Sequence, residues 1–320
     1  MPDGMIRFGN TQQDLKVRQK PVAMTDTKLD PLLPVPGRPI VIVVVALYHL
    51  IALLALFSYF FSWTGICLAV AGALLSSLGI TLCYHRMLAH KGLSCSKRVE
   101  HCLAVLGVMA NQLGPAYWVA IHRRHHQFGD EHRDPHSPVT GFFWSHVGWL
   151  LAASANTDPT PITERYAKDV LKDPFYAWLE VNGHWGWIVG ASGAACFAAG
   201  VLAEILTGGT LADAVQFGAS LFVWGTVVRT VFVWHLTWSI NSVCHCWGYR
   251  SHATPDRSRN NPIFGILSFG EGWHNNHHAF PRSARHGHRW WELDLTWLVI
   301  KCLAAVGLVK ILNVAEPEHS

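Results

Sequence analysis

Four long apolar stretches dominate the chain and restrict the folds open to it. They run approximately from Pro39 to Phe61, from Thr64 to Tyr84, from Trp185 to Leu206 and from Leu211 to Ile240. Each is long enough to cross a bilayer about 30 Å thick, which takes roughly 20 helical residues. The composition agrees, since 50% of the 320 residues are hydrophobic and only 14% are charged. The sequence therefore predicts an all-α integral membrane protein with four transmembrane helices.

The connections between the stretches predict their pairing and their orientation. Only a few residues around Trp63 join the first two stretches, and Thr207–Thr210 join the last two, so we predict two helical hairpins. Of the 25 lysines and arginines, six precede Ile40, ten lie between His85 and Gly183, eight follow Ile240, and Arg229 lies inside the fourth stretch. The positive-inside rule then places both termini and the long middle segment in the cytosol.

This pattern divides the chain into two parts. Residues 1–38 are predicted to be a flexible cytosolic tail, and residues 39–320 a membrane domain. A helical cap on the cytosolic side is expected from residues 85–183 and 241–320. The apolar segments 102–120 and 293–312 contain polar interruptions and are interpreted as helices of this cap or of the membrane interface. The net charge of +4 suits contact with membrane lipid and is too small to indicate nucleic acid.

Histidines form an unusual pattern just outside the apolar stretches. There is one H-x4-H box, there are two H-x2-H-H boxes, and a lone histidine follows Asn241 by four residues; together these are His85, His90, His122, His125, His126, His245, His274, His277 and His278. Positions i, i+3 and i+4 share one face of a helix, so each H-x2-H-H box is expected to converge. A regular helix would splay the pair five residues apart, so one of that pair is expected at or beyond a helix end.

The number of these histidines indicates the kind of site. Neutral imidazole is the commonest side-chain ligand of borderline transition metals. Nine imidazoles are too many for one metal ion and about right for two. We therefore predict a dinuclear metal site at the membrane surface, suited to oxidative chemistry on an acyl chain.

Other polar residues have less specific interpretations. Asp130, Glu131 and Asp134 follow the second box closely, where they could accept hydrogen bonds from ligand imidazoles, cap helices or face solvent. His49 and His235 lie within apolar stretches and are interpreted as hydrogen-bonded interior residues. For a third group, loop or surface roles are expected, with contact to the metal ligands as the alternative: His132, His136, His146, His184 and His252.

Several motifs in this order resemble the integral-membrane fatty acid desaturases of the Δ9, stearoyl-type group. Beyond the histidine boxes, they are W-V-A-I-H-R-R-H-H at Trp118–His126, D-P-H-S at Asp134–Ser137, G-F-F-W-S-H-V-G-W at Gly141–Trp149, T-W-S-I-N-S-V-C-H at Thr237–His245 and G-E-G-W-H-N-N-H-H-A-F-P at Gly270–Pro281. The resemblance extends from about Ile40 to Leu308.

The resemblance implies a function and a set of site residues. It implies a di-iron centre bound by the nine histidines, with Asn241 reaching one iron through a water. The reaction would place a cis double bond in a saturated acyl chain, with O2 as co-substrate and two electrons from a separate donor of the ferredoxin or cytochrome b5 type with its reductase. Trp118 and Trp238 match residues that shape the acyl tunnel, and Ala69 and Ala73 match its end.

One departure from the family concerns the acyl carrier. In the animal enzymes that use acyl-CoA, an Arg-Asp pair precedes the second box and contacts the CoA group, whereas this chain has Ala120 and Ile121 there. The substrate is therefore either an acyl-CoA held in another way or a membrane glycerolipid. The basic residues that could hold CoA instead are Arg123, Lys91, Arg282, Arg285 and Arg289.

Two other functions share some of these features. A membrane hydroxylase or alkane monooxygenase uses related histidine boxes, but the order of the boxes and the N-x3-H element favour desaturation. A histidine-rich metal transporter is the more distant alternative, because transport sites lie near the bilayer midplane. Here the histidines cluster beyond one end of the apolar stretches.

Overall fold

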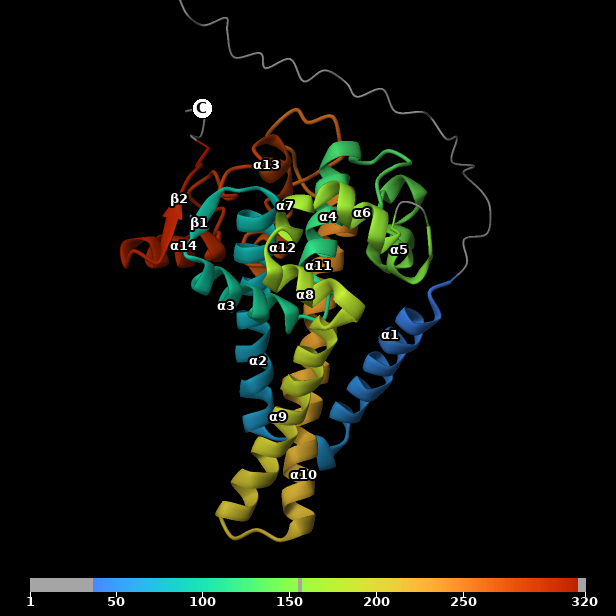
Figure 1. Cartoon of the computed structure of the whole chain (residues 1–320), viewed down its shortest axis with the longest axis vertical. Coiled ribbons are helices and arrows are strands. Elements are labelled where there is room, and N and C mark those ends of the chain that lie inside the picture. Colours follow the sequence, from blue (N-terminus) through green and yellow to red (C-terminus); the bar gives the residue numbers. More distant parts are fainter. Residues whose placement is uncertain (1–36, 155–156, 316–320) are drawn as a thin grey trace, which may run out of the picture. The chain divides into compact units, whose positions relative to one another are not determined.

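The structure is a computed structural model that describes residues 37–154 and 157–315 (Figure 1). Apart from Gly37 and Arg38, the predicted N-terminal tail lies outside these ranges. The described residues are mostly helical, as predicted. One small antiparallel pair of strands, β1 (Leu93–Cys95) and β2 (Val309–Ile311), was not expected from the sequence.

Four helices are long and apolar enough to cross a membrane, which confirms the predicted number. The first is α1 (Pro39–Ala52) with a 3-10 turn at Leu53–Leu56, and the second is α2 (Trp63–Leu78), which continues as a π-helix over Gly79–Ala89. The third is α9 (Trp185–Leu206). The fourth begins as α10 (Leu211–Phe222) and passes through a π-helical turn at Val223–Val228 into α11 (Arg229–Cys246).

The ends of these helices differ from the predicted boundaries. The first stops at Leu56, because Phe57 is in an extended conformation. The second and fourth run past Tyr84 and Ile240 to Ala89 and Cys246. Hydrophobicity falls in these added turns, but the helical hydrogen bonds continue, and the turns carry His85 and His245.

Apart from the 3-10 turn at Ser58–Phe60, which joins the first two long helices beside α10, the remaining elements gather at the other end of the four long helices (Figure 1). Their helices are α3 (Lys97–Val108), α4 (Pro115–Phe128), α5 (Trp149–Leu151), α6 (Pro159–Tyr166), α7 (Lys168–Leu171), α8 (Pro174–Glu180), α12 (Pro262–Leu267), α13 (His274–Ala279) and α14 (Leu295–Ala305). Short 3-10 turns occupy Ser58–Phe60, Pro138–Thr140 and Val181–Gly183, and a short π-helix occupies Trp144–Gly148. The two ambiguous apolar segments form parts of α3, α4 and α14, each too short to cross a bilayer.

Close backbone approaches fix how the helices pack. A Cβ added to Gly79 would lie 2.1 Å from the backbone nitrogen of Gly107, so α3 rests directly on the π-helix that carries His85. A Cβ on Gly200 would lie 2.7 Å from the Cα of Gly218, where α9 meets α10. These contacts leave no room for a side chain at the crossing points.

Arg229 shows how the fourth span accommodates a cation. Its side chain is buried and donates to the carbonyl of Met109, just past the end of α3, at 3.0 Å. A helix C-terminus is a favourable place for a positive charge. Gly72 of α2 makes room for it, since a Cβ there would lie 2.6 Å from the Arg229 Cδ.

Candidate metal centre

The nine predicted histidines come together in two adjacent sets. The first set, which we call the five-histidine set, contains His85, His90, His122, His126 and His277. The second, the four-histidine set, contains His125, His245, His274 and His278. Within each set the ligand nitrogens all lie within 4.8 Å of one another. The two sets meet where the rings of His126 and His278 stack with centroids 4.3 Å apart.

Each H-x2-H-H box is divided between the two sets, which corrects the expectation that a box converges on one point. On α4, His122 and His126 belong to the five-histidine set and His125 to the four-histidine set. On α13, His277 belongs to the former, with His274 and His278 in the latter. One helix face is wide enough to border both positions.

The first box behaves as predicted for a pair five residues apart. His85 lies in the π-helix, and His90 is the residue that follows its end. The backbone N–H of His90 donates to the carbonyl of His85 at 3.1 Å, a hydrogen bond of the π-helical i to i+5 type. This wider turn brings both rings into the same set, with centroids 4.9 Å apart.

The imidazoles face one another through their Nε2 atoms. In the five-histidine set, Nε2 of His277 lies 3.0 Å from that of His85 and 2.9 Å from that of His126, and the His90–His122 pair is at 2.7 Å. In the four-histidine set the corresponding distances are 3.0 Å for His245–His274 and 3.4 Å for His125–His278. Carboxylates hold the hydrogen on Nδ1 of both His125 and His278, so the Nε2 lone pairs of these two rings face each other and repel unless a cation lies between them. The donor set therefore fits a bound metal.

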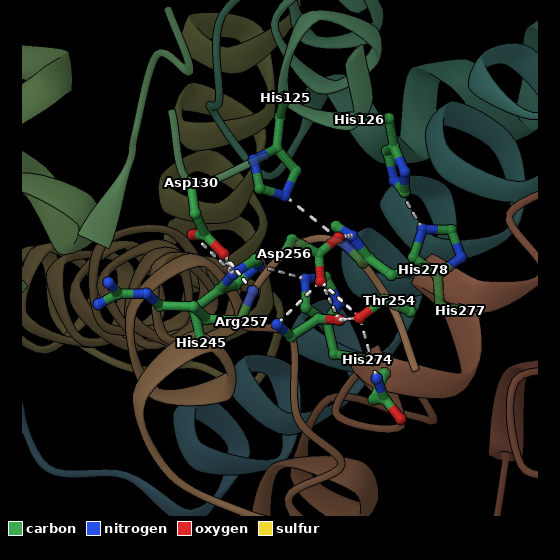
Figure 2. A network of polar contacts seen from close by, with 12 residues as sticks. His125, His126, Asp130, His245, Thr254, Asp256, Arg257, His274, His277 and His278 are labelled. Carbon is green, nitrogen blue, oxygen red and sulfur yellow. Dashed lines mark hydrogen bonds and ion pairs between the residues drawn. The ribbon is translucent and has the colours of Figure 1, made fainter. Parts of the chain in front are cut away.

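Carboxylates orient these rings from behind. Nδ1 of His125 lies 2.9 Å from Asp134. Nδ1 of His245 lies 3.1 Å from Asp130 (Figure 2). Nδ1 of His278 lies 2.6 Å from Asp256. Nδ1 accordingly carries the hydrogen, and Nε2 presents its lone pair to the metal position, an arrangement typical of metal-bound histidines.

The five-histidine set has one such carboxylate among the described residues. Glu271 contacts Nδ1 of His85 with one oxygen and receives the guanidinium of Arg86 on the other at 2.8 Å. Arg86 is fully buried and also pairs with Asp294 at 2.9 Å. The arginine therefore ties the first box to the segment that carries the third.

Sequence reasoning found only part of this carboxylate group. It identified Asp130 and Asp134 as candidate partners, whereas Glu131 is exposed. It missed Asp256, which no motif marks. It also missed Glu271, which lies three residues before His274 in a G-E-G-W sequence that was a usable signal.

Electrostatics keep the ligands in the form that binds metal. Burial and the neighbouring imidazoles hold the pKa values of His122, His126, His274 and His277 well below the usual range for histidine. Burial lowers the pKa of His278 to about 4, although Asp256 opposes the shift. Burial alone would raise the pKa of Asp134, but His125 and His136 hold it well below its usual value. Most of the imidazoles are thus neutral and the carboxylate is ionised at neutral pH.

Two cavities border the histidines. The larger, of about 230 Å³, is lined by Trp118 and Trp238, as well as by His122 and Asn241. The smaller, of about 50 Å³, shares Trp118, His122 and Asn241 and adds ligands from both sets: His85, His125 and His274. The Trp118 ring stacks on His122 with centroids 5.1 Å apart. Both predicted tunnel tryptophans therefore lie on a cavity wall.

The predicted tunnel end lies deeper than the cavities. Ala69 and Ala73 are buried in α2, but neither lines either cavity. The residues of this helix that do line the smaller cavity are Ser77, Ile80 and Thr81. The role predicted for the two alanines stays a prediction.

Two of the basic residues considered for CoA, Arg123 and Lys91, have other contacts. Arg123 donates to Asp169 at 2.6 Å and to the carbonyls of Leu88 and Ala89 at 2.7 and 3.0 Å. Lys91 pairs with the same Asp169 at 3.0 Å. Ala120 and Ile121, which replace the Arg-Asp pair, are buried.

A further acidic cluster lies apart from the two sets. His101, Glu100 and Asp173 face one another, but Lys97 reaches the two carboxylates at 2.7 and 3.0 Å. The lysine ammonium supplies the positive charge that a metal would bring. His101 therefore offers a control histidine outside the metal centre.

Comparison with known proteins gives a consistent result. The family model described as fatty acid desaturase matches residues 61–305. An sn-1 stearoyl-lipid 9-desaturase of Synechocystis is 41% identical over 82% of this chain and 76% of its own length. A chloroplastic palmitoyl-monogalactosyldiacylglycerol delta-7 desaturase of Arabidopsis thaliana is 42% identical over 87% of this chain and 70% of its own. An icosanoyl-CoA 5-desaturase of Limnanthes douglasii is 41% identical over 86% and 72%.

Proposed function

Because the chain belongs to the fatty acid desaturase family, as its sequence motifs predicted, we propose that it introduces a cis double bond at the Δ9 position of a saturated acyl chain. The observation that carries the proposal is the division of nine histidines into two sets that both border the smaller cavity. A hydroxylase would share the metal site, and the family match favours desaturation. A transporter would need its ligands within the bilayer.

The residues divide the work of the reaction. Two iron ions in the histidine sets would supply the O2 chemistry that removes hydrogens from adjacent methylenes, which side-chain acids and bases cannot do. Asp130, Asp134, Asp256 and Glu271 hold the imidazoles in position. Trp118 and Trp238 provide apolar walls that hold the chain beside the ligands and exclude water. Asn241 borders both cavities and would contact one iron through a water.

We propose a membrane glycerolipid as the acyl carrier. Arg123 is committed to Asp169 and to backbone carbonyls, and apolar residues occupy the positions of the Arg-Asp pair. The Synechocystis and Arabidopsis relatives are named for lipid substrates. Electrons would come from a separate ferredoxin- or cytochrome b5-type protein.

The membrane arrangement is also part of the proposal. The distribution of lysine and arginine supports two hairpins, with both termini and the cap of residues 85–183 and 241–320 in the cytosol. The redox partner would then reach the cap from the cytosol.

Expression in a host that lacks unsaturated fatty acids tests the function. Gas chromatography with mass spectrometry of the membrane lipids should show a cis Δ9 double bond for the native chain and for His101→Ala, and none for His277→Ala. Hydroxylated chains in place of the double bond would overturn desaturation in favour of the hydroxylase. Unmodified lipids with altered cellular iron would favour the transporter.

A further inference from the structure

The larger cavity has a wall that is held much less firmly than the others. Four residues of α1 line it, namely Ile40, Val41, Val44 and Val45. No residue of α1 is buried, whereas α11 on the opposite wall buries Val233, Trp234 and Trp238. Figure 1 shows α1 leaning away from the other long helices as it approaches α5. One side of the cavity is therefore a helix without a buried residue, whose aromatic packing on α11 is the half-buried Tyr48 ring, 5.0 Å from that of Trp234.

Polar contacts attach α1 at two levels. At its first turn, the Arg38 backbone N–H donates to Leu151 at 2.7 Å, and its guanidinium donates to Thr157 at 2.9 Å. Farther along the helix, Nε2 of His49 lies 3.0 Å from Nε2 of His235 on α11. The histidine contact joins α1 directly to α11, beside a hydrogen bond of Tyr48 with Asn111.

This contact belongs to a longer chain of imidazoles that is separate from the two metal sets. Nδ1 of His235 lies 3.0 Å from Nε2 of His146, whose ring stacks on that of His235. Nδ1 of His146 lies 2.9 Å from the Ser242 hydroxyl. The histidine chain, as we call His49, His235 and His146, thus joins α1, α11 and the short π-helix at Trp144–Gly148. The hydrogen bonds expected for His49 and His235 are confirmed, but the interior position is wrong for His235, which is exposed, and His49 is half-buried. The loop role expected for His146 is also wrong, because this residue lies in a π-helix.

The ends of the histidine chain determine what it can do. The Val45 carbonyl lies 2.7 Å from His49 Nδ1, so His49 donates there and its Nε2 must accept from His235. With neutral rings, His146 then donates to His235 and its Nδ1 must accept from Ser242, whose single hydroxyl hydrogen can bind either His146 at 2.9 Å or the Trp238 carbonyl at 3.0 Å. A backbone carbonyl accepts a hydrogen bond but does not pass a proton on, so the chain ends at Val45. It is suited to holding helices together and unsuited to conducting protons.

We propose that α1 is a movable wall through which the acyl chain of a bilayer lipid enters the cavity, and that the histidine chain is the latch that holds this wall closed. The occupant follows from the position of the wall, because α1 is a candidate membrane span and its cavity side is apolar. The inference rests on the proposed function only for the identity of the occupant. Opening the His49–His235 bond would admit a chain that continues past Trp238 and Asn241 to the metal ligands.

Labelling of a buried thiol tests the latch without any turnover. Thr237→Cys places a thiol on the cavity wall formed by α11, where a reagent must enter the cavity to reach it. The purified protein is reconstituted in phosphatidylcholine vesicles and treated with N-dodecylmaleimide, which partitions into the bilayer, or with a sulfonated maleimide, which does not. Peptide mass spectrometry then measures modification at this one position among the native cysteines.

His49→Leu should raise the rate of dodecylmaleimide labelling about fivefold, the change expected for loss of one net hydrogen bond. His146→Leu leaves the His49–His235 bond in place and should give a smaller rise. His101→Leu, a cap histidine bonded to Asp173 at 2.9 Å, should give none. The sulfonated reagent should show no rise in any of the three variants.

Two results would overturn the proposal: equal dodecylmaleimide rates in His49→Leu and the native background, or an equal rise with both reagents. Native Cys83 and Cys244 are buried and report unfolding if they become labelled. If His49→Leu unfolds by this criterion, the test rests on His146→Leu alone. An unchanged dodecylmaleimide rate in His146→Leu would then refute the latch. If His49→Leu raises dodecylmaleimide labelling but the native chain makes no double bond, the entrance at α1 is supported and the proposed desaturase function is refuted. If the native chain desaturates normally but His49→Leu does not raise dodecylmaleimide labelling, only the proposed entrance at α1 is refuted.

Discussion

The two histidine sets differ in how they are supported. Three of the four rings in the four-histidine set have a carboxylate on Nδ1, whereas His85 is the ring in the five-histidine set with such a partner among the described residues. The five-histidine set has one more imidazole, and the buried Arg86–Glu271 pair helps to hold its rings in place. One position is therefore stabilised by the number of ligands and the other by the groups behind them.

Loss of a direct ligand should have the largest effect and should be unequal between the sets. His125→Ala leaves three imidazoles, and His277→Ala leaves four. We expect each to reduce desaturation more than about 100-fold, beyond the usual cost of losing a supporting group. Iron per protein, measured by inductively coupled plasma mass spectrometry, should fall further for His125→Ala. Full activity in either variant would refute the assignment, and equal iron loss would refute the contrast between the sets.

Loss of a carboxylate should separate metal binding from stability. Asp256→Asn removes the charge behind His278 and should lower iron affinity about 10–100-fold, with little change in the thermal midpoint of the metal-free protein. Glu271→Gln should lower that midpoint as well, because it weakens the partner of the buried Arg86. Iron titration and thermal unfolding of both variants measure this difference. Identical behaviour of the two would show that the carboxylates have one shared role.

Asn241 should matter less than the histidine one turn away on the same helix. A water-mediated contact tunes a metal, so Asn241→Ala should cost about 10–100-fold in activity. His245→Ala should abolish activity, because it removes a ligand of the four-histidine set. Product formation in matched membranes compares the two. If Asn241→Ala is as inactive as His245→Ala, the asparagine binds directly or is needed for folding.

Substitutions near the proposed tunnel end should have the smallest effect. They should change the acyl chain length of the products and leave iron binding intact. Ser77→Phe fills the smaller cavity, and Ala73→Phe acts one turn deeper on α2. Each should shift the products toward shorter acyl chains, the first more strongly, because overfilling a packed site is costly. Ala71→Phe, on the exposed side of the same helix, is the matched control. Fatty-acid profiles and iron content measure the outcome, and an unchanged profile in a stable, active variant removes that residue from the tunnel.

The sequence predicted much of the metal centre because local rules apply there. Helical spacing placed the histidines of each H-x2-H-H box on one face. The separation of five residues correctly predicted that one of His85 and His90 lies at or beyond a helix end, and the structure shows that it is His90. Hydropathy located four spans, although it ended two of them too early, since the polar turns that carry His85 and His245 remain helical. Asp130 and Asp134 were found because they lie close to their box in the chain.

The sequence by itself determined which residues can bind metal and which stretches can cross a membrane, because both depend on residue type and on spacing within one helix. Only the tertiary structure decided that each H-x2-H-H box is divided between the two histidine sets, because that depends on how α2, α4, α11 and α13 are placed relative to one another. The same reason applies to Asp256, Glu271 and the histidine chain. His49 and His146 meet opposite sides of His235 although 186 and 89 residues separate them from it, a proximity that no local pattern encodes.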